Sequence, residues 1–579
     1  MTLYIILIFV ALCAGMAISV HAFGTGGKRK RIFQDIYFSV EDTEGVGVLY
    51  TKTGEYSAVL KIENPVQKYS ANIDSYYDFT HLFSALALTL GEGYAIHKQD
   101  IFVRKRFVNE DTGKQEFLSE SYFRYFKGRA YTDSMCYLTI TQEARKSRLF
   151  SFDNKKWRDF LVKIRKVQDQ LRDSGVQARF LNKSEASDYV DRYFAMNFKD
   201  RIISMTNFKT DDESVSMGDK RCKVYSLVDV DCISLPSMIR PYTNIEVNNT
   251  EMPVDLVSAI DSIPNADTVV YNQVIFLPNQ KRELSLLDKK KNRHASIPNP
   301  SNQAAVEDIK RVQEVIARES KQLVYSHFNL IVAVSGDTDL QKCTNHLENA
   351  FGRMGIHISK RAYNQLELFV GSFPGNCYSL NEEYDRFLTL SDAAMCLMYK
   401  ERVQHSEDTP VKVYYTDRQG VPVAIDITGK EGRQKLTDNS NFFALGPSGS
   451  GKSFPHELCR APAARTGYRH RNGRYRKLLR GIVRVSGRQV HQLHGGTPHH
   501  DEPVPYPQGR DERGKDRLPE ESCPADLEGH AGNSHEDGRP SGGKCNHRLL
   551  RRVFQRLRRL HAHAAGRPEK KPRHRRTQP

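Results

Sequence analysis

The sequence predicts an α/β protein in which a mixed α+β N-terminal region leads into the first strand and loop of a second domain, and a disordered tail follows. Three observations predict this organisation. Before residue 430, short apolar runs alternate with apolar periods typical of helices. A glycine-rich loop at 446–453 follows one more apolar run. Beyond residue 455 neither period continues.

Residues 1–27 predict a membrane anchor. Leu3–Phe23 is an apolar run of about 20 residues, which is long enough to span a bilayer. The basic cluster Lys28–Arg31 follows it, and this order places the rest of the chain in the cytoplasm. The alternative is a cleaved signal peptide, which normally begins with basic residues that are missing here. An uncleaved anchor is therefore favoured. An alternative interpretation of the basic cluster is that it forms a surface in contact with anionic lipid.

Residues 28–430 predict the mixed α+β region, because strand and helix patterns alternate along it. In its first half the pattern predicts a hairpin (46–50 and 56–60), a helix (76–90), strands (100–103 and 137–141) and helices (157–171 and 183–194). In its second half it predicts a strand (269–277), a mobile charged loop (281–302), a helix (306–323), a strand (328–334), a helix (339–354), a strand (366–371) and a hairpin (411–415 and 421–426).

No catalytic constellation is recognisable before residue 446. The Tyr and His residues are dispersed along the chain, so a core or surface role is expected for each. The ten cysteines are scattered singly and none forms a C-x-x-C pair. This spacing predicts neither a zinc site nor a disulfide scaffold, and free thiols suit a reducing cytosol.

Residues 446–453 match the P-loop pattern G-x-x-x-x-G-K-[ST], which binds the phosphates of a nucleoside triphosphate. The preceding run Asn441–Leu445 is short and apolar, as a buried strand should be. Lys452, the expected catalytic residue, would reach the β- and γ-phosphates, and the Ser453 hydroxyl would bind Mg²⁺. Residues 431–454 are thus the expected start of a P-loop domain. The expected nucleotide-binding residues are Gly446, Pro447, Ser448, Gly449, Ser450, Gly451, Lys452 and Ser453.

Residues 455–579 depart from this pattern. They hold 28 Lys and Arg against 13 Asp and Glu, so this tail carries nearly all of the net charge of +17. The tail is either a basic nucleic-acid-binding segment or an out-of-frame translation. A shift of one base, with wobble positions chosen freely, turns Cys459–Val485 into VVRQLLEQGTDIVMVDTGNSYEGLCEY, which has the pattern of a helix and a buried strand. We therefore favour a frameshift near the codons of Phe454 and Pro455.

Three segments together resemble the TraG ATPases of conjugative transposons, the large VirB-type ATPases of type IV secretion. They are Asn441–Ser453 (NFFALGPSGSGKS), Phe373-Pro374-Gly375-Asn376 and Ile32-Phe33-Gln34-Asp35. The resemblance covers residues 1–454. It implies a cytoplasmic ATPase at the inner membrane that forms a hexamer, works with other conjugation proteins and powers DNA transfer. It also implies that residues 446–453 hold ATP and Mg²⁺.

The same resemblance implies that this chain does not hydrolyse ATP. The family's Walker B acid and arginine finger lie beyond the chain, even with the frame restored. The expected function is therefore that of an ATP-binding, non-hydrolysing fragment of a conjugation ATPase. The alternative is a membrane-anchored scaffold whose basic tail binds nucleic acid or acidic lipid, which an out-of-frame tail disfavours. A third hypothesis, an unrelated P-loop enzyme, is disfavoured by the lost helical period after Pro455.

Overall fold

The computed structural model describes residues 36–426, which belong to the first of two compact units, Met1–Val490. Within that range it leaves out residues 71, 109–116, 145–152, 201–202, 204–207, 212, 228–238, 248–249, 298, 320, 337–339, 360–363, 404–405, 408–412 and 417–420. The expected anchor, the P-loop and the tail lie outside the described residues. Among the helices that are described, none is both long and apolar enough to cross a bilayer.

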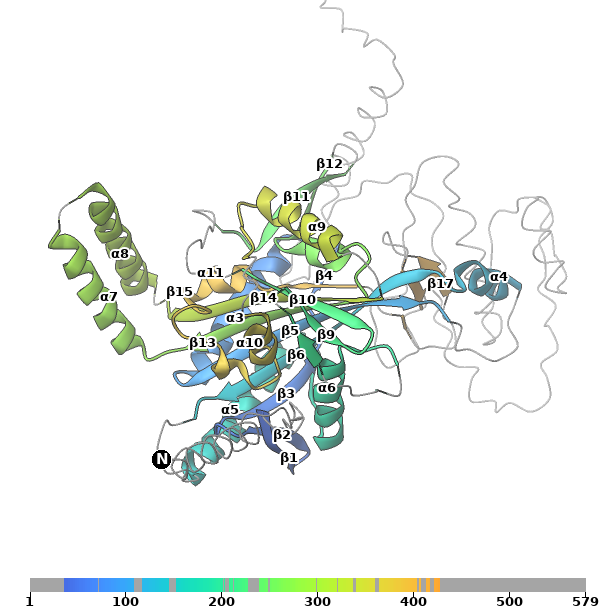
Figure 1. The fold of residues 1–579 in the computed structure, drawn as a ribbon, viewed down its shortest axis with the longest axis horizontal. Helices are drawn as coiled ribbons and strands as arrows, with labels where there is room; N and C mark the ends of the chain where they lie inside the picture. Colours follow the sequence, from blue (N-terminus) through green and yellow to red (C-terminus); the bar gives the residue numbers. More distant parts are fainter. Residues whose placement is uncertain are drawn as a thin grey trace, which may run out of the picture. The chain divides into compact units, whose positions relative to one another are not determined.

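A twelve-stranded antiparallel sheet forms the centre of the described region (Figure 1). Its spatial order is β1 (Tyr37–Thr43), β2 (Val46–Thr51), β3 (Tyr56–Ile62), β6 (Ala130–Gln142), β5 (Tyr94–Arg106), β13 (Thr268–Leu277), β14 (Leu323–Ser335), β10 (Lys220–Ser226), β9 (Val215–Met217) and β8 (Phe208–Thr210). Two short strands pair beside this path, β7 (Ala178–Phe180) with β3 and β15 (Phe387–Leu390) with β14. Every residue of β13 is buried, and most of its side chains are apolar, although Asn272 and Gln273 are buried among them.

Helices cover both faces of the sheet, so the described region has three layers. On one face pack α3 (Asp74–Leu90), α5 (Asn154–Asp173), α9 (Leu340–Arg353) and α11 (Ser391–Cys396). On the other face pack α6 (Lys183–Ala195) and α10 (Gln365–Gly371). Successive strand residues alternate between these two cores: Ile96 of β5 contacts the first, and Ala95 contacts the second. The expected mixture of helices and strands is confirmed at this level.

The strongest sequence patterns are confirmed element by element. The hairpin at 46–60 corresponds to β2 and β3, and the helices expected at 76–90, 157–171 and 183–194 are α3, α5 and α6. The Asn182 side chain and Glu185 form a capping box at the start of α6, which fixes where this helix begins. The strand expected at 100–103 is much longer, because β5 begins at Tyr94.

The charged loop expected at 281–302 is wrong. This stretch contains α7 (Gln280–Ala295) and the beginning of α8 (Pro300–Glu319), which form a helical hairpin. The Asn279 side chain accepts a hydrogen bond from the Arg282 amide and starts α7. Lys, Arg and Glu are good helix formers, so a charged composition did not exclude a helix. The helix expected at 306–323 likewise begins at Pro300, and Leu323 already belongs to β14.

The strand expected at 366–371 is also wrong, because these residues form α10. A short apolar run is compatible with either structure, and here the tertiary contacts decide. The Gln365 side chain bonds the backbone of β10, accepting from Val224 N at 2.8 Å and donating to Val224 O at 2.9 Å. These bonds occupy main-chain groups of β10 that another strand would need. The turn Phe373-Pro374-Gly375 follows this helix rather than closing a strand.

The remaining elements lie around this sheet. They are β4 (Val66–Gln67) paired in parallel with β16 (Glu401–Arg402), β11 (Tyr242–Val247) paired with β12 (Thr250–Asp255), α4 (Phe117–Phe126), η1 (Ser258–Ser262), η2 (Cys377–Ser379), and β17 (Val413–Thr416) paired with β18 (Pro422–Ile425). The last pair confirms the hairpin expected before the P-loop strand. Tyr122 of α4 donates to Tyr415 O at 2.7 Å, so α4 holds this hairpin.

Candidate functional site

The eight P-loop residues at 446–453, and the expected strand before them, lie outside the described residues. The structure therefore brings none of the predicted site residues together and separates none of them. What it describes is the body of the protein up to residue 426, just before that strand. The polar side chains inside this body define the candidate site.

Charged side chains are buried in the middle of the sheet. The Lys98 ammonium, which has no solvent exposure, forms an ion pair with Asp100 on the same strand and donates to Tyr399 O at 2.8 Å. Asp100 also accepts from Asn64 Nδ2 at 2.8 Å and from Gln273 Nε2 at 2.7 Å. Burial alone would lower the pKa of Lys98, but the Asp100 carboxylate outweighs it and the pKa is raised. Lys98 therefore keeps its proton inside the protein.

A second buried group of charges lies beside the first. Lys400 and Asp255 form an ion pair at 3.4 Å with no solvent exposure of either side chain. Glu401 accepts from Tyr76 Oη and from the Asp255 amide, both at 2.7 Å. Burial first, and then the negative charge of Asp255, raise the pKa of Glu401 to about 7. The Lys68 ammonium, 3.9 Å from the second Glu401 oxygen, opposes this shift.

These polar groups fix residues 396–402, which we call the exit segment because the chain continues from it to the β17–β18 hairpin. Tyr271 Oη donates to Leu397 O at 2.9 Å, and Asn64 Nδ2 donates to Glu401 O at 2.9 Å. The bond from Lys98 to the Tyr399 carbonyl lies between them. Buried charges that meet the backbone in this way specify one path for the chain. The network therefore holds the segment that leads towards the P-loop.

The opposite face of the same strands carries a row of neutral polar side chains. Asn272 of β13 accepts from Gln99 Nε2 and donates to Asn329 Oδ1, both at 2.8 Å. Tyr189 of α6 donates to Gln99 Oε1 at 2.6 Å. His97 Nε2 lies 3.3 Å from Asn272 Oδ1, and its Nδ1 has no hydrogen-bond partner. The row joins α6 to the sheet through hydrogen bonds rather than through charges.

The buried His97 makes stability fall in acid. Burial lowers its pKa to about 3, whereas an unfolded His has a pKa near 6.5, so the unfolded state takes up a proton first as the pH falls. The stabilising contribution of neutral His97 is complete above pH 6.5 and is lost towards pH 3. We expect it to fall by about 2 kcal/mol between pH 8 and pH 5. His97→Gln should remove this part of the slope in denaturant titrations at both pH values, whereas substitution of the exposed His81 should not.

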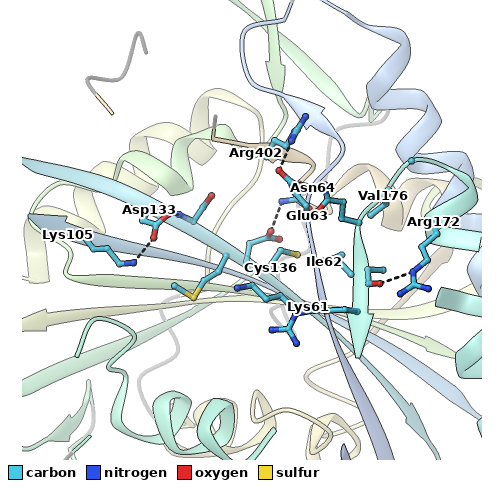
Figure 2. Close-up of a pocket in the computed structure, with 17 residues that line it drawn as sticks. Lys61, Ile62, Glu63, Asn64, Lys105, Asp133, Cys136, Arg172, Val176 and Arg402 are labelled. Carbon is cyan, nitrogen blue, oxygen red and sulfur yellow. Dashed lines mark hydrogen bonds and ion pairs between the residues drawn. The ribbon is translucent and has the colours of Figure 1, made fainter. Parts of the chain in front are cut away.

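A cleft of about 810 Å³ opens beside the Asp100 end of the charge network (Figure 2). Its size suits a small molecule. Its charged lining residues are Lys61, Glu63, Asp100, Lys105, Asp133, Arg172, Arg179 and Arg402. Most of these charges are paired within the protein: Lys105 Nζ lies 2.6 Å from Asp133, and Arg402 Nη1 lies 2.5 Å from Glu63. Figure 2 shows both pairs among the side chains that line the cleft.

The wall of the cleft also contains a cysteine. Cys136 lies in its wall, but burial first and the Asp100 charge second raise the pKa of its thiol well above the usual value, so it is not a thiolate nucleophile. In the described ranges, no cluster of three or more His, Cys, Asp or Glu is placed to bind a metal ion. The five described cysteines are all buried free thiols.

The charge network was missed by sequence reasoning for a physical reason. His97-Lys98-Gln99-Asp100 carries no apolar alternation, so the strand was expected to begin only at residue 100. Long polar side chains are rarely buried unless they are paired, and the Tyr399 carbonyl that accepts from Lys98 belongs to a residue far away in the chain. The one available signal was a polar run directly before a strongly apolar strand.

The comparisons with known proteins add no relative to this picture. No known family model matches the chain, and no curated protein matches it.

Proposed function

We propose that the chain is an ATP-binding component of a conjugative type IV secretion system, of the TraG type. In this proposal the sheet body is the N-terminal region of the conjugation ATPase, and residues 446–453 begin its ATPase domain. The observation that carries the proposal is the complete P-loop, with its apolar strand pattern directly before it. The exit segment and the β17–β18 hairpin would connect the body to that loop.

The proposed partners and location follow from the same reading. Residues 1–27 would anchor the chain in the inner membrane with the body on the cytoplasmic side. There it would meet other proteins of the conjugation apparatus, and the full-length relatives would assemble as hexamers. Because residues 455–579 do not continue the helix and strand patterns of a P-loop domain, the chain would bind ATP with Mg²⁺ without turning it over.

Lys452→Ala is expected to weaken ATP binding by about 10–100-fold, because it removes a charged hydrogen bond to the phosphates. Binding of a fluorescent ATP analogue with Mg²⁺ to the purified full chain measures this. Lys342→Ala, at an exposed position of α9, is the matched control and should bind like the parent chain. Equal binding by the Lys452 variant and the parent would contradict the assignment of the phosphate site.

Hydrolysis tests the second part of the proposal separately. Phosphate release by the parent chain is expected at the level of the buffer blank. Turnover that disappears in the Lys452→Ala variant would show that the chain carries a complete catalytic site, and it would contradict the fragment hypothesis.

Sequencing the gene around codon 454 decides the origin of the tail. An intact reading frame there would contradict the frameshift hypothesis.

The basic tail supports a second candidate function, a membrane-anchored scaffold that binds nucleic acid. The observation that favours this function is that the tail holds 28 Lys and Arg but only 13 Asp and Glu. Under this hypothesis, deletion of residues 455–579 would lower affinity for duplex DNA, and binding by the parent chain would fall steeply with salt. Equal DNA affinity with and without the tail would exclude it.

A further inference from the structure

The α7–α8 hairpin projects from the edge of the described body (Figure 1). The two helices hold each other, with Gln313 of α8 accepting from Lys291 Nζ and donating to Asp288 Oδ1, both at 2.9 Å. At its base, Tyr325 of β14 donates to Glu283 Oε2 at 2.8 Å. Glu283 is the buried residue of α7, and α8 has none among its described side chains. Most of the hairpin surface is therefore open to contact.

One line of exposed side chains on α7 combines cations with large apolar groups. Its five members, called the outer stripe below, follow one another at intervals of three or four residues, so the four within the helix share one face and the fifth follows the helix end. They are Arg282, Leu286, Lys289, Arg293 and Ile297, the last just beyond the helix end. Leu286 is 43% exposed and Ile297 is 63% exposed. The stripe contains no acidic residue.

We propose that the outer stripe docks the hairpin on an anionic membrane surface. Arg282, Lys289 and Arg293 would meet the negative headgroups, and Leu286 and Ile297 would enter the boundary between headgroups and acyl chains. A membrane surface would therefore offer favourable contacts to the cationic and to the apolar side chains of the stripe at the same time. The phosphates of a nucleic acid would use the three cations but would leave the two apolar side chains in water.

The stripe lies on a projecting hairpin, which is a suitable position for contact with a broad, flat surface such as a membrane. A flat bilayer meets protruding parts of a protein first, and Figure 1 places this hairpin away from the sheet. The proposal rests in part on the anchor proposed at residues 3–23, which would keep the body close to the membrane. The hairpin would then supply a second contact, and two weak contacts on one chain raise the effective affinity of each.

Sedimentation of the full chain with lipid vesicles tests the stripe. The vesicles contain phosphatidylcholine alone or phosphatidylcholine with phosphatidylglycerol. The triple variant Arg282→Gln, Lys289→Gln, Arg293→Gln is expected to lose up to about 100-fold in affinity for the anionic vesicles. The double variant Leu286→Ala, Ile297→Ala is expected to lose about 10-fold. Far-UV circular dichroism checks that each variant keeps its helices.

The matched control removes three cations from the other helix of the same hairpin. Lys310→Gln, Arg311→Gln, Arg318→Gln changes the net charge equally at exposed positions of α8 and should retain most of the binding. Equal losses in this control and in the stripe triple variant would overturn the proposal, because net charge alone would explain both. Stripe substitutions that weaken binding to duplex DNA and leave vesicle binding unchanged would overturn it in favour of a nucleic acid.

Binding to the neutral vesicles separates the stripe from the anchor. If the anchor proposal fails, neutral vesicles retain none of the chain, yet anionic vesicles still bind it in a stripe-dependent way. If the stripe proposal fails, the parent and both stripe variants bind anionic vesicles equally, whatever the neutral vesicles show.

Discussion

Replacing Lys98 with Met is expected to destabilise the protein by about 3–5 kcal/mol, because it leaves a buried carboxylate without its cation. The Lys98 side chain has no solvent exposure, and the side chain of Asp100 is 3% exposed. Met fills a similar volume, so the loss reports the charge and not a cavity. The bond to Tyr399 O disappears as well, which should loosen the exit segment. Urea unfolding followed by circular dichroism measures the change.

The control for this experiment lies on the same strand. Lys105 of β5 pairs with Asp133 at 2.6 Å, but these side chains are 31% and 29% exposed, and water screens the pair. Lys105→Met should therefore cost less than about 1 kcal/mol. Similar costs for the two substitutions would mean that the Lys98 pair is no more important than a surface pair, and the proposed role of the network in holding the exit segment would be wrong.

Gly375→Ala is expected to cost about 2–4 kcal/mol, through backbone strain and a steric clash together. Gly375 has φ of +78°, which favours glycine. A Cβ there would lie 2.6 Å from Ser57 Oγ and 3.0 Å from Ser57 Cβ, and Ser57 is completely buried in β3. Thermal unfolding of the purified chain measures the loss.

Gly355→Ala separates the two causes. Gly355 follows α9 with φ of +72°, and a Cβ there would meet nothing within 4 Å. Its substitution should cost only the backbone term, about 1 kcal/mol. A loss at Gly375 no larger than that at Gly355 would show that the close approach to Ser57 is relieved by movement.

Hydrogen bonds hold the segment around Gly375 against two other parts of the fold. Phe373-Pro374-Gly375-Asn376 contributed to the likeness with the conjugation ATPases as a string of residues. In the structure Tyr37 Oη donates to Pro374 O at 2.6 Å, and Asn376 Nδ2 donates to Val370 O at 2.9 Å. The motif is thus a buried turn that connects α10 to the first strand of the sheet. The quoted segment at 32–35 lies outside the described residues.

Local sequence patterns predicted the elements in which the positions of the apolar residues follow directly from which face of the element is buried. The helices α3, α5 and α6 each present a single apolar face, and β13 is mostly apolar because it is buried on both faces. Burial stabilises an apolar side chain whichever apolar residues surround it. The spacing of apolar residues is therefore enough to predict such elements. Where the apolar run was short, at 366–371, the same rule did not distinguish helix from strand.

The sequence by itself determined the mixed helix and strand composition of the body, the hairpins at 46–60 and 413–425, and the P-loop motif on which the proposed function depends. Tertiary structure alone decided that the sheet is antiparallel, that α7 and α8 form an arm, and that Lys98, Asp100 and Tyr399 meet inside the protein. The reason is the range of the interactions. A buried charge is stable only beside its partners, and some of these come from distant parts of the chain, such as the Tyr399 carbonyl for Lys98 and Lys400 for Asp255. Their meeting depends on the whole fold.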